Sequence, residues 1–156
     1  MRTRAIRSAA ALAASAVVVG VALAGCTPIV ALDPAPDAAS PLCAAVSVRL
    51  PDEVDGLPAR ETNAQATGAW GNPTAVVLHC GVASPPPTSE LPCVTPPGGA
   101  VDWLVDDSDA PTYVFTSYGR TPAVSVAIDN TVVSGVSVLD AIDVAVSQLP
   151  RSGSCL

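Results

Sequence analysis

Apolar and polar positions alternate along several short segments of the chain, and turn-forming residues separate these segments. The alternation is clearest in two of them: Val124, Val126 and Ile128 in one, and Val101, Trp103 and Val105 in the other. Side chains two positions apart lie on one face of a strand, so the pattern predicts half-buried strands. With the other β-prone runs bounded by Gly, Pro and Asp, the sequence predicts five strands, at residues 75–80, 93–95, 100–105, 112–117 and 123–128.

A helix is expected near the C-terminus, where apolar residues recur at three- and four-residue spacing. Its apolar stripe consists of Val138, Leu139, Ile142, Ala145, Val146 and Leu149. We expect Ser137 to cap this helix and Pro150 to end it. Asp140 and Asp143 lie early in it, where the helix dipole favours negative charge.

A shorter helix is expected over residues 41–50. Ser40 is a typical N-cap, Pro41 suits the first helical position, and Pro51 ends the helix. We therefore expect an α+β fold: a small antiparallel sheet of about four or five strands, with an N-terminal and a C-terminal helix packed on one face.

The N-terminus has the order of a bacterial secretory signal. Arg2, Arg4 and Arg7 precede an apolar run over residues 9–22, and the sequence Leu-Ala-Gly-Cys follows at residues 23–26. These four residues match the lipobox of bacterial lipoproteins, which predicts cleavage after residue 25 and a diacylglyceryl group on the thiol of Cys26. The alternatives are an uncleaved transmembrane anchor, for which the apolar run is marginal in length, and a soluble secreted protein.

Composition changes once residues 1–25 are removed. Four arginines then remain against all 14 acidic residues, a net charge of −10, and the chain contains no lysine. Such a balance lacks the basic surface that nucleic acids require. Residues 26–40 are expected to form the lipidated cysteine and a flexible, Pro-rich tether, and residues 41–156 a single domain. The expected location is the outer face of the cell membrane, after Sec-type export.

Four cysteines remain besides Cys26, an even number that predicts two disulfides in an exported chain. Three pairings are possible. We favour Cys80–Cys93, which closes a local loop, and Cys43–Cys155, which joins the two ends of the domain. A zinc site is the alternative, but no Cys-x-x-Cys spacing occurs and the chain has one histidine. We expect neither a metal nor a cofactor.

Several motifs in order resemble one known family, the actinobacterial envelope proteins catalogued as domain of unknown function 3515. The motifs are Ala-Trp-Gly-Asn-Pro at residues 69–73, Leu-His-Cys-Gly-Val at 78–82, Val-Asp-Trp at 101–103 and Tyr-Gly-Arg-Thr-Pro-Ala-Val at 118–124. The resemblance covers the mature domain from about Cys43 to Leu149 and, with the lipobox, implies a high-GC source. It implies no activity. The turn over residues 95–100 departs from the family pattern, which leaves the register of that hairpin open.

Candidate chemistry is sparse. His79 is the lone imidazole, and no Gly-x-Ser-x-Gly motif accompanies it, so a strand histidine on the face opposite to Val76, Leu78 and Cys80 is expected rather than a hydrolase triad. The acidic run over residues 102–109 lacks the glycine turn and distal glutamate of a calcium loop. Pro85, Pro86 and Pro87 are expected to stiffen a loop, with a polyproline ligand as the alternative.

Arg120 is the candidate ligand-binding residue, because positive charge is scarce and this arginine lies in a turn beside Tyr118. It could bind a carboxylate or phosphate, with Tyr118 and Trp70 near the site, or it could pair with an internal acid or a helix carbonyl. The two tryptophans fit core or turn packing equally well.

The expected function is that of a membrane-anchored, non-enzymatic binding or interaction module. Its partners are the membrane, through the lipid on Cys26, and an envelope protein or a cell-wall component. The alternatives are a binding protein for a small anionic or cell-wall-derived ligand and, less favoured, a hydrolase that uses His79 or the acidic residues.

Overall fold

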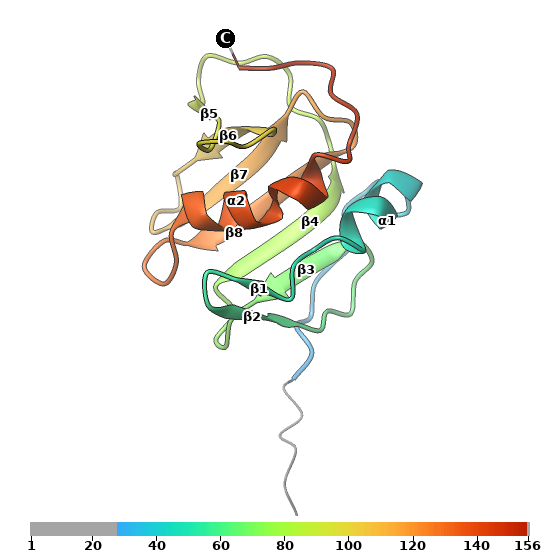
Figure 1. Ribbon diagram of the computed structural model, residues 1–156, viewed down its shortest axis with the longest axis vertical. Helices are drawn as coiled ribbons and strands as arrows, with labels where there is room; N and C mark the ends of the chain where they lie inside the picture. The colour runs from blue at the N-terminus through green and yellow to red at the C-terminus, as the bar shows by residue number, and fades with distance from the viewer. Residues whose placement is uncertain (1–27, 156) are drawn as a thin grey trace, which may run out of the picture.

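Eight antiparallel strands form one sheet in the computed structural model of the protein, which describes residues 28–155 (Figure 1). The order across the sheet is β1-β2-β3-β4-β8-β7-β6-β5. The strands are β1 (Glu53–Val54), β2 (Leu57–Arg60), β3 (Thr67–Trp70), β4 (Val76–Val82), β5 (Cys93–Val94), β6 (Asp102–Asp106), β7 (Thr112–Tyr118) and β8 (Ala123–Asp129).

Two short helices accompany the sheet: α1 (Pro41–Ser47) and α2 (Gly135–Val146). α2 lies across one face of the sheet, and its residues Leu139 and Ile142 are buried against the strands (Figure 1). The strands alternate as their sequences predict, so Val124, Val126 and Ile128 of β8 face this core and are fully buried. The opposite face carries half-buried residues such as His79 and Ser125, which are register partners on β4 and β8.

The expected fold class is wrong. The protein is mostly β, with eight strands in place of four or five and two short helices. All five predicted strands are present within two residues of their expected bounds, and the three missed strands, β1, β2 and β3, come between α1 and β4. β2 contains Pro58 and shows no alternation of burial, and β3 contains Gly68. Neither strand carries the apolar periodicity that reveals a strand in sequence.

Each helix begins directly after a serine, but only the serine before α1 forms a side-chain cap. Ser40 is the N-cap of α1, as predicted, and its hydroxyl accepts a hydrogen bond from the backbone N–H of Leu42 at 3.3 Å. α2 begins three residues earlier than expected, with Ser134 rather than Ser137 at the N-cap. Within residues 28–155, neither helix has the length and the apolar character needed to cross a bilayer.

Two disulfides form, as predicted, but the favoured pairing is wrong. Cys43 on α1 bonds Cys80 on β4, and Cys93 on β5 bonds Cys155 near the C-terminus. The register explains this outcome. Cys80 faces the core, where α1 packs, whereas Cys93 lies on the edge strand at the far end of the sheet.

Residues 28–40, named here the stem, pack along the domain, and this differs from the expected flexible tether. Val30 forms a parallel β-bridge with Thr62, and the backbone N–H of Asp37 donates to the carbonyl of Gly81 at 2.9 Å. Gly81 has a φ of +104°, and a Cβ at this position would lie 2.5 Å from the carbonyl carbon of Asp37. This glycine therefore permits the close approach of the stem.

Candidate functional site

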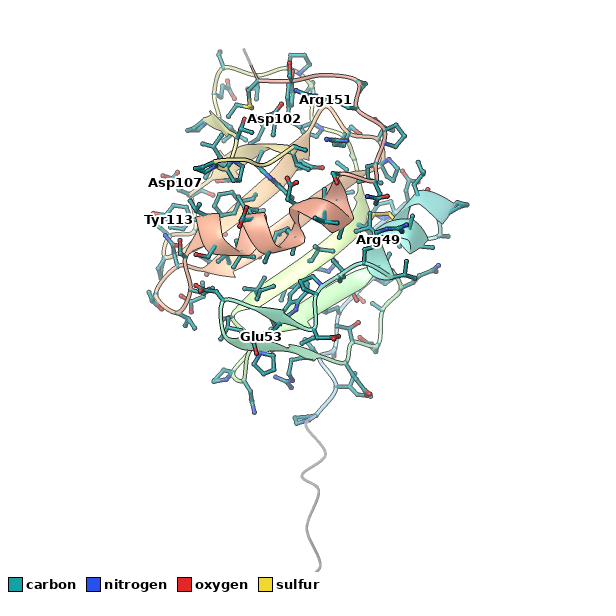
Figure 2. The ribbon with its side chains drawn as sticks, viewed as in Figure 1. Arg49, Glu53, Asp102, Asp107, Tyr113 and Arg151 are labelled. Atoms are coloured by element: carbon teal, nitrogen blue, oxygen red, sulfur yellow. A yellow bond between two sulfur atoms is a disulfide. The ribbon has the colours of Figure 1, made fainter. Side chains whose placement is uncertain are left out.

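A cavity of about 350 Å³ lies between the N-terminal end of α2 and strands β6 and β7. We name it the α2 cavity. Its floor is formed by Val105, Tyr113 and Phe115, which point from β6 and β7 toward the helix. Figure 2 shows Tyr113 beside the N-terminal end of α2. One wall is helical, and the other is formed by residues 94–97, the last residue of β5 and the loop after it with its two prolines.

The two aromatic rings of the floor come from one strand. Tyr113 and Phe115 are two residues apart on β7 and thus share a face, and they are two of the five aromatic residues in the chain. Phe115 is 8% exposed, and Tyr113 is half-buried and partly accessible from the cavity. The chain therefore places a large fraction of its aromatic surface at this one cavity.

The helical wall consists of Gly135, Val136 and Leu139. Gly135 lets the helix approach the floor, because a Cβ at this position would lie 2.9 Å from Cζ of Phe115. The backbone N–H of Gly135 donates to Oδ1 of Asn130 at 3.2 Å, which fixes the loop that enters α2. Val136 is 56% exposed at the mouth of the cavity.

Among residues 28–155, no charged residue lines the α2 cavity. Its lining is aliphatic, aromatic and proline side chains with a few neutral polar groups, Thr95, Asn130 and Ser134. A ligand that enters it exchanges water for apolar contacts, and the neutral polar groups at the rim can orient that ligand. Chemically, the cavity suits an uncharged apolar or aromatic group of small size.

Arg120, the sequence-based candidate for ligand binding, donates to the protein's own backbone. Its side chain is 5% exposed, its Nη1 donates to the carbonyls of Ser147 and Leu149, and its Nη2 donates to the carbonyl of Ala100 at 2.7 Å. Nε alone has no hydrogen-bond partner among the described residues, and it is buried. Burial, and then the charge of Arg151, lower the pKa of Arg120. This geometry favours the structural interpretation, a bond to helix carbonyls.

The structure does not bring Trp70 to Arg120. Trp70 is 1% exposed, its Nε1 donates to the carbonyl of Pro51 at 3.0 Å, and its register position lies opposite Val76, at one end of β4. Val76 pairs with Ile128, near the C-terminal end of β8. Arg120 lies before the N-terminal end of β8, in the turn after β7. Tyr118 lies near Arg120 but faces away from α2, beside Pro87 and Cys155 at a second, polar hollow.

His79 lies on the open face of β4, as its alternation predicts, between Thr67 of β3 and Ser125 of β8. Within the described part of the chain the one ion pair joins Arg151 and Asp102, and no carboxylate holds the ring of His79, so the three groups of a hydrolase triad are not assembled there. The acidic run is dispersed too. Asp102 accepts bonds from Arg151 and from the N–H of Cys155, whereas Asp106 caps its own turn. Residues 28–155 contain no group of three or more His, Cys, Asp or Glu placed to hold a metal.

A family profile matches residues 5–153 and is described as protein of unknown function (DUF3515). The chain belongs to this family, which confirms the part of the resemblance that concerns domain of unknown function 3515. The family assigns it no enzymatic activity. No curated protein and no solved structure matches the chain.

Sequence reasoning missed the α2 cavity. The available signal was the spacing of Tyr113 and Phe115 on one predicted strand, in a chain with few aromatic residues. The cavity itself depends on the gap left by Gly135 and on the position of residues 94–97, which are about forty residues away in sequence. Periodicity within one element carries no information on such a gap between elements.

Proposed function

We propose that the protein is a lipid-anchored envelope protein whose folded domain is a non-enzymatic binding module, with the α2 cavity as its ligand site. The N-terminal order of arginines, apolar run and Leu-Ala-Gly-Cys supports the anchor, and the family match begins at residue 5, within that segment. The observation that carries the binding role is the α2 cavity, an aromatic-floored, uncharged hollow in a strongly acidic protein.

The ligand of this proposal is a small uncharged apolar group, such as an aromatic ring or a branched aliphatic chain on an envelope component. An anion is disfavoured, because no Arg of the described residues contributes to the lining and the chain has no Lys. The volume of about 350 Å³ falls within the range of small-molecule sites and is too small for a folded partner.

A neutral fluorescent probe tests the binding role. N-phenyl-1-naphthylamine, which brightens in apolar surroundings, is titrated into the Cys26→Ser chain so that detergent is not needed. We expect saturable binding that Val136→Glu weakens about tenfold, because the charge would lie at the apolar mouth. Val144→Glu is the matched control, since Val144 is 68% exposed on the same helix and outside the cavity.

The same titration can overturn the binding role. Absence of saturable binding would do so, and so would equal affinities of the two glutamate variants. Methyl NMR shifts at Val136 and Leu139, but not at Val144, supply a second readout that does not depend on probe brightness.

The anchor has its own test. The intact chain, expressed in a host that lipidates exported proteins, should carry a diacylglyceryl mass on Cys26 and sediment with membranes. The Cys26→Ser chain should appear in the soluble fraction. A chain that sediments equally with and without Cys26 would contradict lipid anchoring.

A further inference from the structure

The stem joins the domain almost at its first described residue. The carbonyl of Pro28 accepts a hydrogen bond of 2.6 Å from Nη2 of Arg60 on β2. Nη1 of the same guanidinium donates to the carbonyl of Gly71 at 2.9 Å and lies 3.4 Å from Oγ1 of Thr74. Arg60 thus ties the start of the stem to the turn between β3 and β4.

Further contacts follow along the stem without a gap long enough to act as a spacer. The N–H of Val30 donates to the carbonyl of Glu61 at 2.9 Å, and the N–H of Leu32 donates to Oδ1 of Asn63 at 2.7 Å. Ala38, near the end of the stem, is 4% exposed. The stem therefore runs along the domain and leaves little free chain before it.

Chain geometry then limits the distance between lipid and domain. Two Cα steps separate Cys26 from Pro28, which gives at most about 7 Å of reach. This step rests on the proposed lipid anchor. With so short a connection, Pro28 stays within about 7 Å of the lipidated residue, so the part of the domain around Pro28 lies close to the headgroup layer.

We infer that the side of the sheet formed by β1 and β2, along which the stem lies, docks on the bilayer surface, with Ile29 inserted into the interfacial layer. Ile29 is 58% exposed, although it is a large aliphatic side chain three residues from Cys26. Its transfer from water to the interface is favourable, and it adds a second contact to the acyl anchor. Attraction to anionic headgroups is not part of this docking, because the mature chain is acidic.

The strand order sets what faces away from the bilayer. Four strand spacings separate β3 from β6, roughly 20 Å at the usual distance between neighbouring strands. In Figure 1 the chain enters at the bottom, beside β2 and β3, and ends at the top, beyond β5 and β6. Figure 2 shows Asp102 and Arg151 at that far end. The α2 cavity, built on β6 and β7, is therefore held away from the membrane.

Quenching by brominated lipid tests the orientation on the intact lipidated chain in phosphatidylcholine vesicles. Ile29→Trp places a tryptophan at the proposed contact, and Leu91→Trp places one at the far edge, where Leu91 is 37% exposed. Trp70 and Trp103 are at most 1% exposed and are common to both variants. We expect lipid brominated on the acyl chains to remove about half of the added emission in Ile29→Trp, because the indole ring would lie at the depth of the interface. The same lipid should remove almost none of the added emission in Leu91→Trp.

A variant with a longer connection between the lipid and the domain provides the second test. Eight Gly and Ser residues inserted between Thr27 and Pro28 add about 15 Å of root-mean-square reach, so quenching of Ile29→Trp should fall toward that of Leu91→Trp. Equal quenching of the two tryptophans, in chains shown by mass to be lipidated and bound to vesicles, would overturn the orientation and leave the anchor intact. A chain that lacks the lipid mass and does not float with vesicles would overturn the anchor itself, and the orientation with it.

Discussion

The guanidinium of Arg120 donates to the main-chain carbonyl of Leu149, three residues beyond the end of α2. The same Nη1 donates to Ser147 at 3.4 Å, and Nη2 binds Ala100 in the segment before β6. The last turn of α2 contains no basic residue of its own. A side chain from the β7–β8 turn therefore satisfies the carbonyl at the C-cap of α2 and one in the segment beyond it, and it joins this end of α2 to the sheet.

Replacement of Arg120 should destabilise the fold. Arg120→Met keeps the aliphatic length but leaves three carbonyls without their donor, so we expect a loss of about 2–4 kcal/mol in the free energy of unfolding. Urea titration followed by circular dichroism measures it. Arg49→Met is the matched control, because Arg49 is exposed just after α1 and, among the described residues, its side chain donates only to the carbonyl of Ala45; it should cost about 0.5 kcal/mol or less. Equal losses in the two variants would contradict the role of Arg120.

The two disulfides should differ in their resistance to reductant. Cys43 and Cys80 are both 0% exposed, whereas Cys93 lies exposed on the edge strand. Attack by a thiolate requires access to a sulfur atom, so we expect Cys93–Cys155 to be reduced first in the folded protein. Alkylation at graded dithiothreitol concentrations, followed by peptide mapping, gives the order. The same map checks the pairing, and recovery of a Cys80–Cys93 peptide would contradict the structure.

The strands that could be predicted from sequence are those whose burial alternates. β8 shows why: Val124, Val126 and Ile128 face the core, and the residues between them do not. β3 could not be found in this way, because Gly68 must be small where a Cβ would lie 2.7 Å from the ring of Trp70. The choice of residue at this position of β3 depends on its fit to a neighbouring side chain, and such a fit produces no repeating pattern of apolar residues in the sequence.

The disulfide pairing failed for a related physical reason. Closeness in sequence favours Cys80–Cys93, but the long proline-containing segment between β4 and β5 carries Cys93 from the middle of the sheet to its β5 edge. Strand order is a long-range property, and the five predicted strands could have been arranged in several ways. Each observed disulfide closes a loop, of 37 and 62 residues, and is expected to contribute about 4 kcal/mol by chain entropy.

Gly135→Ala should close the α2 cavity with little loss of stability. The new Cβ would meet Cζ of Phe115, the free end of a ring that borders open space, so the ring can turn into the cavity. The higher helix propensity of Ala, up to about 1 kcal/mol, offsets part of the strain. We expect the free energy of unfolding to change by about 1 kcal/mol or less.

Probe binding separates this effect from a general loss of structure. Binding of N-phenyl-1-naphthylamine should fall at least about tenfold in Gly135→Ala, since the displaced ring occupies the apolar volume. Asp140→Ala, an exposed substitution on the same helix outside the cavity, should leave binding unchanged. Undiminished binding in Gly135→Ala would show that the probe binds elsewhere.

The Asp129 carboxylate, at the end of β8, accepts hydrogen bonds from Oγ1 of Thr131 at 2.6 Å and from its backbone N–H at 2.9 Å. The hydroxyl, and then the N–H, lower the pKa of Asp129 below its ordinary value. A depressed folded-state pKa means that the stabilisation is present above the unfolded pKa of about 3.9 and is lost as pH falls through the folded pKa. Thr131→Val removes the hydroxyl and keeps the N–H, so the pKa of Asp129 should rise part of the way toward its ordinary value. Carboxyl ¹³C NMR titration measures the change.

Asp106 is the internal comparison, because the N–H of Ser108 is the main cause of its lowered pKa. Ser108→Ala keeps that N–H and should move the pKa of Asp106 less than Thr131→Val moves that of Asp129. An Asp129 pKa that stays at its wild-type value in Thr131→Val would refute the role of the hydroxyl.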